Sequence, residues 1–256
     1  MERLLLVGIG TGSPSHLTTG AIDALRRADA ILLPDKGPAK ARLAEVRDQL
    51  LDVVFAGRSR PPLVRFIVPR RDTSAPYCEG VEAWHDALAN AWTEALAGSA
   101  PDARRVAMLV WGDPSLYDST TRVARRLRPV PHIEIIPGIT ALQALTTAHG
   151  ITLNTVGGSV LVTTGRRLAA EGFPANAESV VVMLDGSTRF RGLVDEPGLH
   201  VWWGAYLAMP EQRLIAGPLA RVSDEIVAVR EQARREHGWI MDTYLIRRGE
   251  PREDVD

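Results

Sequence analysis

The spacing of apolar positions predicts alternating strands and helices through the first half of the chain. Short continuous apolar runs suit strands covered on both faces, and they alternate with segments whose apolar residues recur at helical spacing. The runs lie at 3–7, 30–33, 64–68, 106–111 and 133–136. The helical segments lie at about 18–28, at 38–52, at 77–96 and from the loop at 112–114 to 127. This alternation predicts βα units and a mainly parallel sheet. Trp84 and Trp92 share one helical stripe, which favours core packing over ligand stacking.

The second half of the chain carries more strands and fewer helices. Its apolar runs lie at 160–163, 180–184, 199–203, 213–216 and 239–246, and one helix is predicted over 224–237, with Gly238 as its stop signal. We therefore expect two α/β domains, residues 1–140 with a mainly parallel sheet and residues 141–256 with a mixed sheet. The charged tail 249–256 is expected to fray.

Composition and charge exclude several classes of protein. Hydrophobic residues make up 45% and charged residues 24% of the 256, as in ordinary soluble domains. A net charge of −1 gives no general attraction to nucleic acid or to anionic membranes, and no apolar run approaches the roughly 20 residues that span a bilayer. The single cysteine, Cys78, excludes an internal disulfide and a multi-cysteine metal site. We expect a cytoplasmic protein with no metal, membrane or nucleic-acid partner.

Three loops follow predicted strands, and ligands bind at the carboxyl ends of parallel strands. The loops read Gly8-Ile9-Gly10-Thr11-Gly12 with Leu17-Thr18 beyond, then Gly112-Asp113-Pro114, and then Pro137-Gly138-Ile139-Thr140. Glycine lets the backbone approach a ligand closely, so we expect valine at Gly10 or Gly112 to fill ligand space without disturbing the fold. Taken singly, the second loop is typical of a turn closed by its aspartate, and the third of a helix start capped by Thr140.

A dinucleotide-binding module is the alternative from another class of function. Asp35 follows the second strand, about where an acid that binds ribose would stand. However, Ser13 occupies the position of the third glycine of that fingerprint, and Pro14 delays the helix to about Thr18. The loop is therefore too long to seat a pyrophosphate on the helix N-terminus, and the dinucleotide interpretation is disfavoured.

Together and in this order, the three loops resemble the signature of the tetrapyrrole methylases, the class III methyltransferases. The resemblance covers essentially the whole chain, with one departure, since many members carry proline where this chain has Thr11. It implies two αβα-like domains with a cleft between them, in which S-adenosylmethionine binds and is converted to S-adenosylhomocysteine. It also implies a precorrin as substrate and a homodimer.

By motif position, the resemblance implies a set of residues that contact the cofactor. Met183 has core packing as its alternative, because methionine often fills gaps in cores, and Leu207 is the last member of the set. The full set is Gly10, Thr11, Gly12, Gly112, Asp113, Leu116, Thr140, Ala141, Met183 and Leu207.

Within the family, residues 33–37 and 112–120 resemble the enzymes that methylate C-1 of precorrin-5, release its acetyl group as acetate and give precorrin-6A. Methyl transfer needs alignment, whereas deacetylation also needs a base and an oxyanion stabiliser. The candidates are Asp35, Lys36, Asp113 and Tyr117, with His16 beside them. The alternative for each is a hydrogen bond that fixes its loop.

A precorrin carries many acetate and propionate side chains, which arginine binds with a forked pair of donors. The segment 58–71 supplies Arg58, Arg60, Arg65, Arg70 and Arg71, whose alternative is a solvated basic surface. A methylase of the same fold could also act on another precorrin, on diphthine or on ribosomal RNA. The net charge of −1 argues against the RNA substrate.

Overall fold

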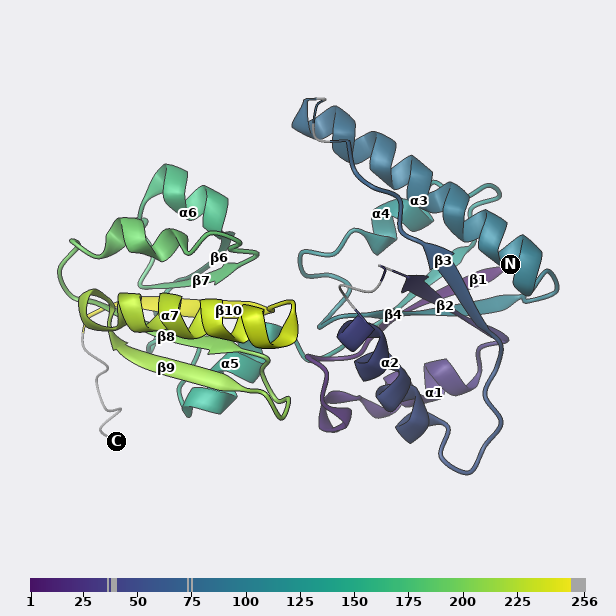
Figure 1. The fold of residues 1–256 in the computed structure, drawn as a ribbon, viewed down its shortest axis with the longest axis horizontal. Helices are drawn as coiled ribbons and strands as arrows, with labels where there is room; N and C mark the ends of the chain where they lie inside the picture. The colour runs from purple at the N-terminus through teal and green to yellow at the C-terminus, as the bar shows by residue number, and fades with distance from the viewer. Residues whose placement is uncertain (36, 38–40, 73, 75, 250–256) are drawn as a thin grey trace. The chain divides into compact units, whose positions relative to one another are not determined.

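The computed structural model describes residues 1–35, 37, 41–72, 74 and 76–249. By proximity of Cα atoms the chain divides into two compact units, Met1–Thr140 and Ala141–Asp256. Each unit is built around its own five-stranded sheet, as Figure 1 shows. The prediction of an α/β protein with a parallel first sheet and a mixed second sheet is therefore confirmed.

The first unit holds a five-stranded sheet in the order β3-β2-β4-β1-β5, and every pairing in it is parallel. Its strands are β1 (Arg3–Gly8), β2 (Ala30–Asp35), β3 (Leu63–Ile67), β4 (Arg105–Val110) and β5 (His132–Ile136). The helices are α1 (Thr19–Arg26), α2 (Ala41–Val54), α3 (Tyr77–Ser99) and α4 (Thr120–Ala124). Helices α1 and α2 cover one face and α3 and α4 the other, which explains the continuous apolar runs (Figure 1).

Two predictions from helical spacing hold in the first unit. Thr18 caps α1, because its side chain accepts a hydrogen bond from the Ala21 amide at 3.0 Å. Trp92 is buried and meets Phe66 edge-on, with ring centroids 5.9 Å apart. Trp84 packs against the same core and donates to the Pro69 carbonyl at 2.8 Å. Both tryptophans therefore belong to the packing of α3 on the sheet.

The second unit holds a mixed sheet in the order β6-β7-β10-β8-β9, in which only β6 and β7 pair in parallel. Its strands are β6 (Val160–Thr164), β7 (Ser179–Met183), β8 (Leu199–Ala205), β9 (Arg213–Pro218) and β10 (Asp242–Arg248). Three helices and a short 3-10 helix accompany them: α5 (Ala141–His149), α6 (Gly165–Glu171), α7 (Leu219–His237) and η3 (Arg189–Leu193).

The sequence-based prediction for the second unit differs most from the structure at one helix and at the start of two elements, while β7, β8 and β9 differ from it by one or two residues. Helix α6 was not predicted, because seven residues are too few for a clear apolar period. Helix α7 begins at Leu219 rather than 224, since its first turn follows Pro218 directly and buries Leu219. Strand β10 begins at Asp242 rather than 239. The stop signal at Gly238 is confirmed, with φ of 73° and its amide bonded to the Arg234 carbonyl.

Three glycines close the carboxyl edge of the first sheet, where the neighbours β4, β1 and β5 end. A Cβ atom built on Gly138 would lie 2.2 Å from the Gly112 carbonyl oxygen and 2.7 Å from the Gly8 carbonyl carbon. A Cβ atom built on Gly8 would lie 2.6 Å from the Gly138 nitrogen. At Gly8 and Gly138, backbone atoms of the neighbouring loops fill the space that a side chain needs, so the loops meet at a distance that only glycine allows at these two positions.

We predict that Gly138→Ala lowers the free energy of unfolding by about 1–3 kcal/mol, the usual cost of forcing extra volume into a packed site. Gly98→Ala is the matched control, because Gly98 lies in α3 and a Cβ atom there meets nothing within 4 Å. That control should raise the free energy of unfolding by up to about 1 kcal/mol. Urea titration followed by circular dichroism measures both, and effects of the same sign would contradict the packing argument.

Candidate functional site

The first and second loops are joined through their backbones. The Gly112 amide donates to the Gly10 carbonyl at 2.7 Å, and the Gly10 amide donates to the Gly112 carbonyl at 3.3 Å. Both glycines have positive φ, 70° at Gly10 and 62° at Gly112, a region that other residues rarely adopt. Their amides therefore serve the contact between the loops.

Asp113 ties the second loop to the third. Its Oδ2 accepts from the Gly138 amide at 2.9 Å, and its Oδ1 accepts from the Ser115 amide at 2.8 Å and from the Ser115 hydroxyl. Burial raises the pKa of the Asp113 carboxyl, but the bonds from Ser115 and Gly138 together outweigh it and hold that pKa below its usual value. A carboxylate so engaged is a poor general base at neutral pH. Its geometry suits positioning of the loops.

The space beside Gly10 is filled by the protein itself, which corrects the expectation that valine there would leave the fold intact. A Cβ atom on Gly10 would lie 2.3 Å from the Cβ of His16. His16 in turn lies 3.0 Å, through Nδ1, from the Thr11 hydroxyl, and its burial lowers the pKa of the imidazole. Gly112 differs, because the nearest atom to a built Cβ is the Thr140 Cα at 3.7 Å. A Cβ atom on Gly112 would therefore make only ordinary van der Waals contacts, whereas one on Gly10 would collide with His16.

Two of the candidate catalytic residues are exposed, Asp35 at the end of β2 and Tyr117 in the loop between β4 and α4. Asp35 is the last residue of β2, and its Oδ1 accepts from the Gly37 amide at 2.9 Å. Lys36 lies outside the described residues. Tyr117 is 44% exposed and has φ of 50°, an uncommon conformation for a residue with a side chain. Leu116 precedes it and is half-buried, with its amide donating to the Asp113 carbonyl at 3.1 Å.

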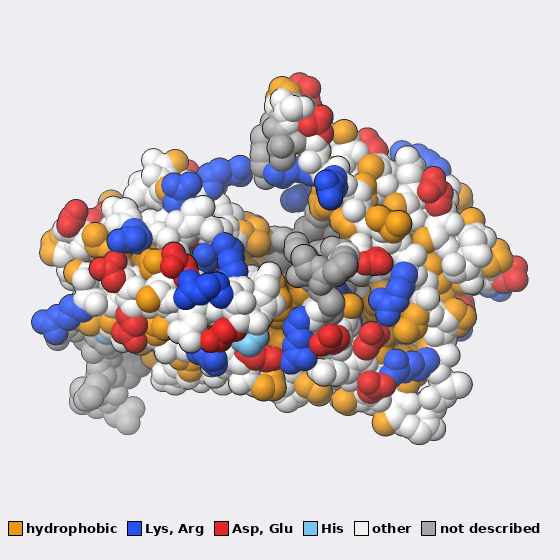
Figure 2. Space-filling view, in the orientation of Figure 1, with side chains coloured by type: hydrophobic (Ala, Val, Ile, Leu, Met, Phe, Trp, Pro, Cys, Tyr) orange, Lys and Arg blue, Asp and Glu red, His pale blue; other side chains and the backbone are white. Residues whose placement is uncertain are grey.

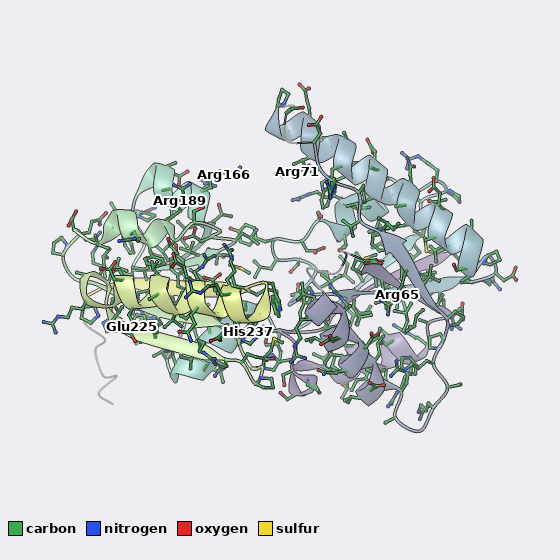
Figure 3. All side chains as sticks on the ribbon, viewed as in Figure 1. Arg65, Arg71, Arg166, Arg189, Glu225 and His237 are labelled. Carbon is green, nitrogen blue, oxygen red and sulfur yellow. The ribbon has the colours of Figure 1, made fainter. Side chains whose placement is uncertain are left out.

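The arginines proposed for substrate binding divide into two groups. Arg65 pairs with Asp48 of α2 at 3.5 Å, and Arg60 pairs with Asp52 of the same helix. Arg58, Arg70 and Arg71 are exposed. In Figure 3, Arg65 projects from β3 and Arg71 from the segment after it. Figure 2 shows basic and acidic side chains interspersed over the visible surface. The arrangement at Arg60 and Arg65 thus favours surface ion pairs over carboxylate binding sites.

In the second unit, Met183 and Leu207 lie at one edge of the sheet. Strands β7 and β8 are both antiparallel to β10, so their carboxyl ends lie on the same side. Met183 ends β7 and is half-buried, whereas Leu207 follows β8 and is 5% exposed. Leu207 packs against Gly204. Thr140 and Ala141 come from another part of the chain. Ala141 is the first residue of α5, and Thr140 immediately precedes it.

A buried polar network, which sequence reasoning missed, fixes the chain after β7. Arg230 of α7 pairs with Asp242 at 2.8 Å and donates to the Asp185 carbonyl at 3.0 Å. The Tyr244 hydroxyl donates to Asp185 Oδ2 at 2.7 Å. Between Met183 and Asp185, Leu184 is 67% exposed and has φ of 55°, so the network holds a strained backbone in place.

The sequence carries a signal for this network. Ile226, Arg230 and Ala233 recur at i, i+4 and i+7 on one buried stripe of α7, and an arginine at such a position needs a buried partner.

The described residues hold no group of three or more His, Cys, Asp or Glu side chains suited to a metal ion. Among the helices described, none is both long and apolar enough to cross a bilayer.

Comparison with known proteins agrees with the loop signature. The family model for tetrapyrrole (corrin/porphyrin) methylases matches residues 3–223. Precorrin-6A synthase [deacetylating] of a Sinorhizobium species is 42% identical over 254 residues, which cover 97% of this chain and 96% of the relative.

Two solved structures have the same fold. A cobalamin-synthesis-related protein from Corynebacterium diphtheriae has 38% identity and a TM-score of 0.80, with 97% of this chain and 99% of that chain covered. Uroporphyrin-III C-methyltransferase from Thermus thermophilus, solved with S-adenosyl homocysteine, has 20% identity and a TM-score of 0.59, with 97% of both chains covered. The chain therefore belongs to the tetrapyrrole (corrin/porphyrin) methylase family, which makes it an enzyme of methyl transfer.

Proposed function

We propose that this protein is an S-adenosylmethionine-dependent methyltransferase of cobalamin biosynthesis, a precorrin-6A synthase of the deacetylating kind. It methylates C-1 of precorrin-5, releases the acetyl group as acetate and gives precorrin-6A. The observation that carries the proposal is the 42% identity to the Sinorhizobium precorrin-6A synthase over 97% of this chain. A methylase acting on another precorrin is the alternative within the family.

The residues present fit S-adenosylmethionine. No protein atom crowds Gly112, where a Cβ atom would lie 3.7 Å from its nearest neighbour, and Asp113 fixes the loops around it. The cofactor would be held by Thr11, Gly12, Gly112, Leu116 and Thr140, with Ala141, Met183 and Leu207 from the second unit. When bound, it supplies a methyl group on a positively charged sulfur that is a good leaving group. The chain's own task is then to align donor and acceptor and to exclude water.

Deacetylation, unlike methyl transfer, also requires side chains that position water or the acetyl oxygen. Water adds to the acetyl carbonyl, the bond from C-1 to the acetyl carbon breaks, and acetate leaves. The electron pair of that bond stays on C-1 and forms the new bond to the methyl group. Asp113 is poorly suited as the base, because its pKa is held down. We assign positioning of water or of the acetyl oxygen to Asp35, exposed at the end of β2, together with Lys36 and Tyr117.

We also propose that the enzyme is a cytoplasmic homodimer. The homodimer follows from the family resemblance. The compartment is supported by the single cysteine, Cys78, which is free and exposed and would persist as a thiol in a reducing environment.

The proposed reaction predicts one acetate for each S-adenosylhomocysteine when the enzyme is given precorrin-5 and S-adenosylmethionine. Both products are assayed in the same samples, with a control that lacks the methyl donor. Methylation without acetate would assign the enzyme to another precorrin. Tight binding of NAD without binding of S-adenosylhomocysteine would instead restore the dinucleotide interpretation.

We predict that Asp113→Asn weakens S-adenosylhomocysteine binding about tenfold or more and lowers stability at pH 7 by about 1.5–3 kcal/mol, the scale of a hydrogen bond to a charged group. Asp118→Asn is the matched control, because Asp118 makes the same turn with Thr120 but, among the described residues, no hydrogen bond to another loop. Calorimetry and urea titration measure affinity and stability.

The stability difference at Asp113 should also depend on pH. The folded state holds the pKa of this carboxyl below its unfolded value of about 3.9. Its contribution is therefore complete above that unfolded value and is lost as the pH falls through the folded one. The difference in the free energy of unfolding between Asp113→Asn and the parent protein should become smaller below about pH 4. A difference that does not change with pH would contradict the assigned hydrogen bonds.

We predict that Asp35→Asn lowers acetate release about 100-fold, the scale of a positioned acid–base group, and leaves S-adenosylhomocysteine affinity within a few-fold. The two half-reactions would then be separable. Melting temperatures of the same samples distinguish this from lost stability, and Asp118→Asn again serves as the control. Full acetate release from Asp35→Asn would remove the assignment.

A further inference from the structure

Arg47 is a buried arginine on α2 whose role the sequence left open. It lies on the stripe that α2 turns toward the core, between the buried residues Val46 and Leu50, and only 5% of it is exposed. Its Nη1 donates to the Leu43 carbonyl at 3.3 Å. Its Nε is buried and has no hydrogen-bond partner among the described residues. A structural role in α2 alone would be met by an apolar side chain.

The charge on Arg47 is costly where it stands. Burial lowers the pKa of the guanidinium to about 10, and the nearby charge of Asp48 offsets this only in part. Arg47 therefore remains protonated at neutral pH. Buried charges are ordinarily paired, yet within the described part of the chain no carboxylate forms an ion pair with Arg47.

The neighbouring arginines behave differently. Arg42 pairs with Glu45, Arg60 with Asp52 and Arg65 with Asp48, so these three arginines on and beside α2 each have a carboxylate partner. The buried arginine, for which a partner matters most, lacks one among the described residues.

The guanidinium is held next to the candidate site. Its Cζ lies 5.1 Å from the centre of the Trp111 ring, within the range of a cation–π contact. Trp111 follows β4 and immediately precedes Gly112, which lies beside Thr140. Trp111 thus lies against the guanidinium beside the second loop, and the forked donors of arginine suit a planar partner with two oxygens.

We propose that Arg47 binds a carboxylate of the ligand, and specifically an acetate or propionate side chain of the tetrapyrrole substrate. This deepens the proposed function and rests on it. The loops proposed for the cofactor follow β1, β4 and β5, whereas Arg47 belongs to α2, the helix that follows β2. The substrate is also the ligand richer in carboxylates. The carboxylate of the cofactor's methionine part is the other source with the same chemistry.

The experiment titrates two probes separately: S-adenosylhomocysteine by calorimetry, and uroporphyrin III, whose side chains are all acetates and propionates, by fluorescence. The proteins are the parent, Arg47→Met and Arg47→Gln, with Arg125→Met as a control that removes an exposed arginine at the C-cap of α4. We expect both Arg47 variants to bind uroporphyrin III about 10–100-fold more weakly, the scale of one charged hydrogen-bonded pair. Affinity for S-adenosylhomocysteine should stay within a few-fold, and the control should match the parent.

The melting temperature distinguishes ligand binding from a structural role of Arg47, because the two roles predict different changes in it. Removing an unpaired buried charge should leave the melting temperature of the ligand-free protein unchanged or raise it. A lower melting temperature with unchanged affinity for both probes would overturn the proposal. Arg47→Gln retains a donor for the Leu43 carbonyl, so failure of both variants to fold would also make the residue structural and overturn it.

The remaining outcomes are equally decisive. Weaker binding of S-adenosylhomocysteine alone would overturn the assignment to the substrate and give the carboxylate to the cofactor. If the parent protein binds neither probe, the proposed function fails by itself. If the parent binds both and the Arg47 variants bind both equally well, the role of Arg47 fails while the proposed function stands.

Discussion

The first unit depends on the contact of three backbone segments at the carboxyl edge of its sheet. Gly8, Gly112 and Gly138 meet so closely that no side chain fits between them. Strand order makes this contact unavoidable, since β1 lies between β4 and β5. The pairing of Gly10 with Gly112 and the bond from Gly138 to Asp113 extend the contact into the loops. Loop geometry is thus set by the backbone and one carboxylate.

The second unit fixes its corresponding edge by a different means. Its sheet is mixed, and the ends of β7 and β8 are separated by β10. Position there is set by buried charge, through Arg230, Asp242 and Asp185, rather than by close backbone packing. Such a network is specific because each polar atom needs its partner, and it holds Leu184 in a conformation that isolated chains avoid.

The sequence predicted the features that depend on pattern. Apolar runs located the ten strands of the described residues, and the alternation of strand and helix was enough to expect a parallel first sheet with its loops on one edge. It failed where the outcome depends on contacts. Helix α6 is too short to show a period. The collision of a Gly10 side chain with His16 follows from the path of a loop that no pattern encodes.

Two buried arginines show what the sequence alone could not predict. Arg230 and Arg47 both lie on buried helical stripes, so their positions alone signal an unusual environment. What the sequence could not supply was the partner. Only the fold shows that Asp242 forms an ion pair with Arg230 and that no described carboxylate forms one with Arg47.

The glycine contact has a consequence for folding kinetics. Gly8, Gly112 and Gly138 are far apart along the chain, and contacts of high sequence separation are completed late because closing long loops is slow. A chain that has formed only its local helices therefore has no binding site. Ligand can add to the native state alone, and by mass action its presence shifts the population away from partly folded forms. In a cell, the supply of ligand would then help to decide how much of the newly made chain survives.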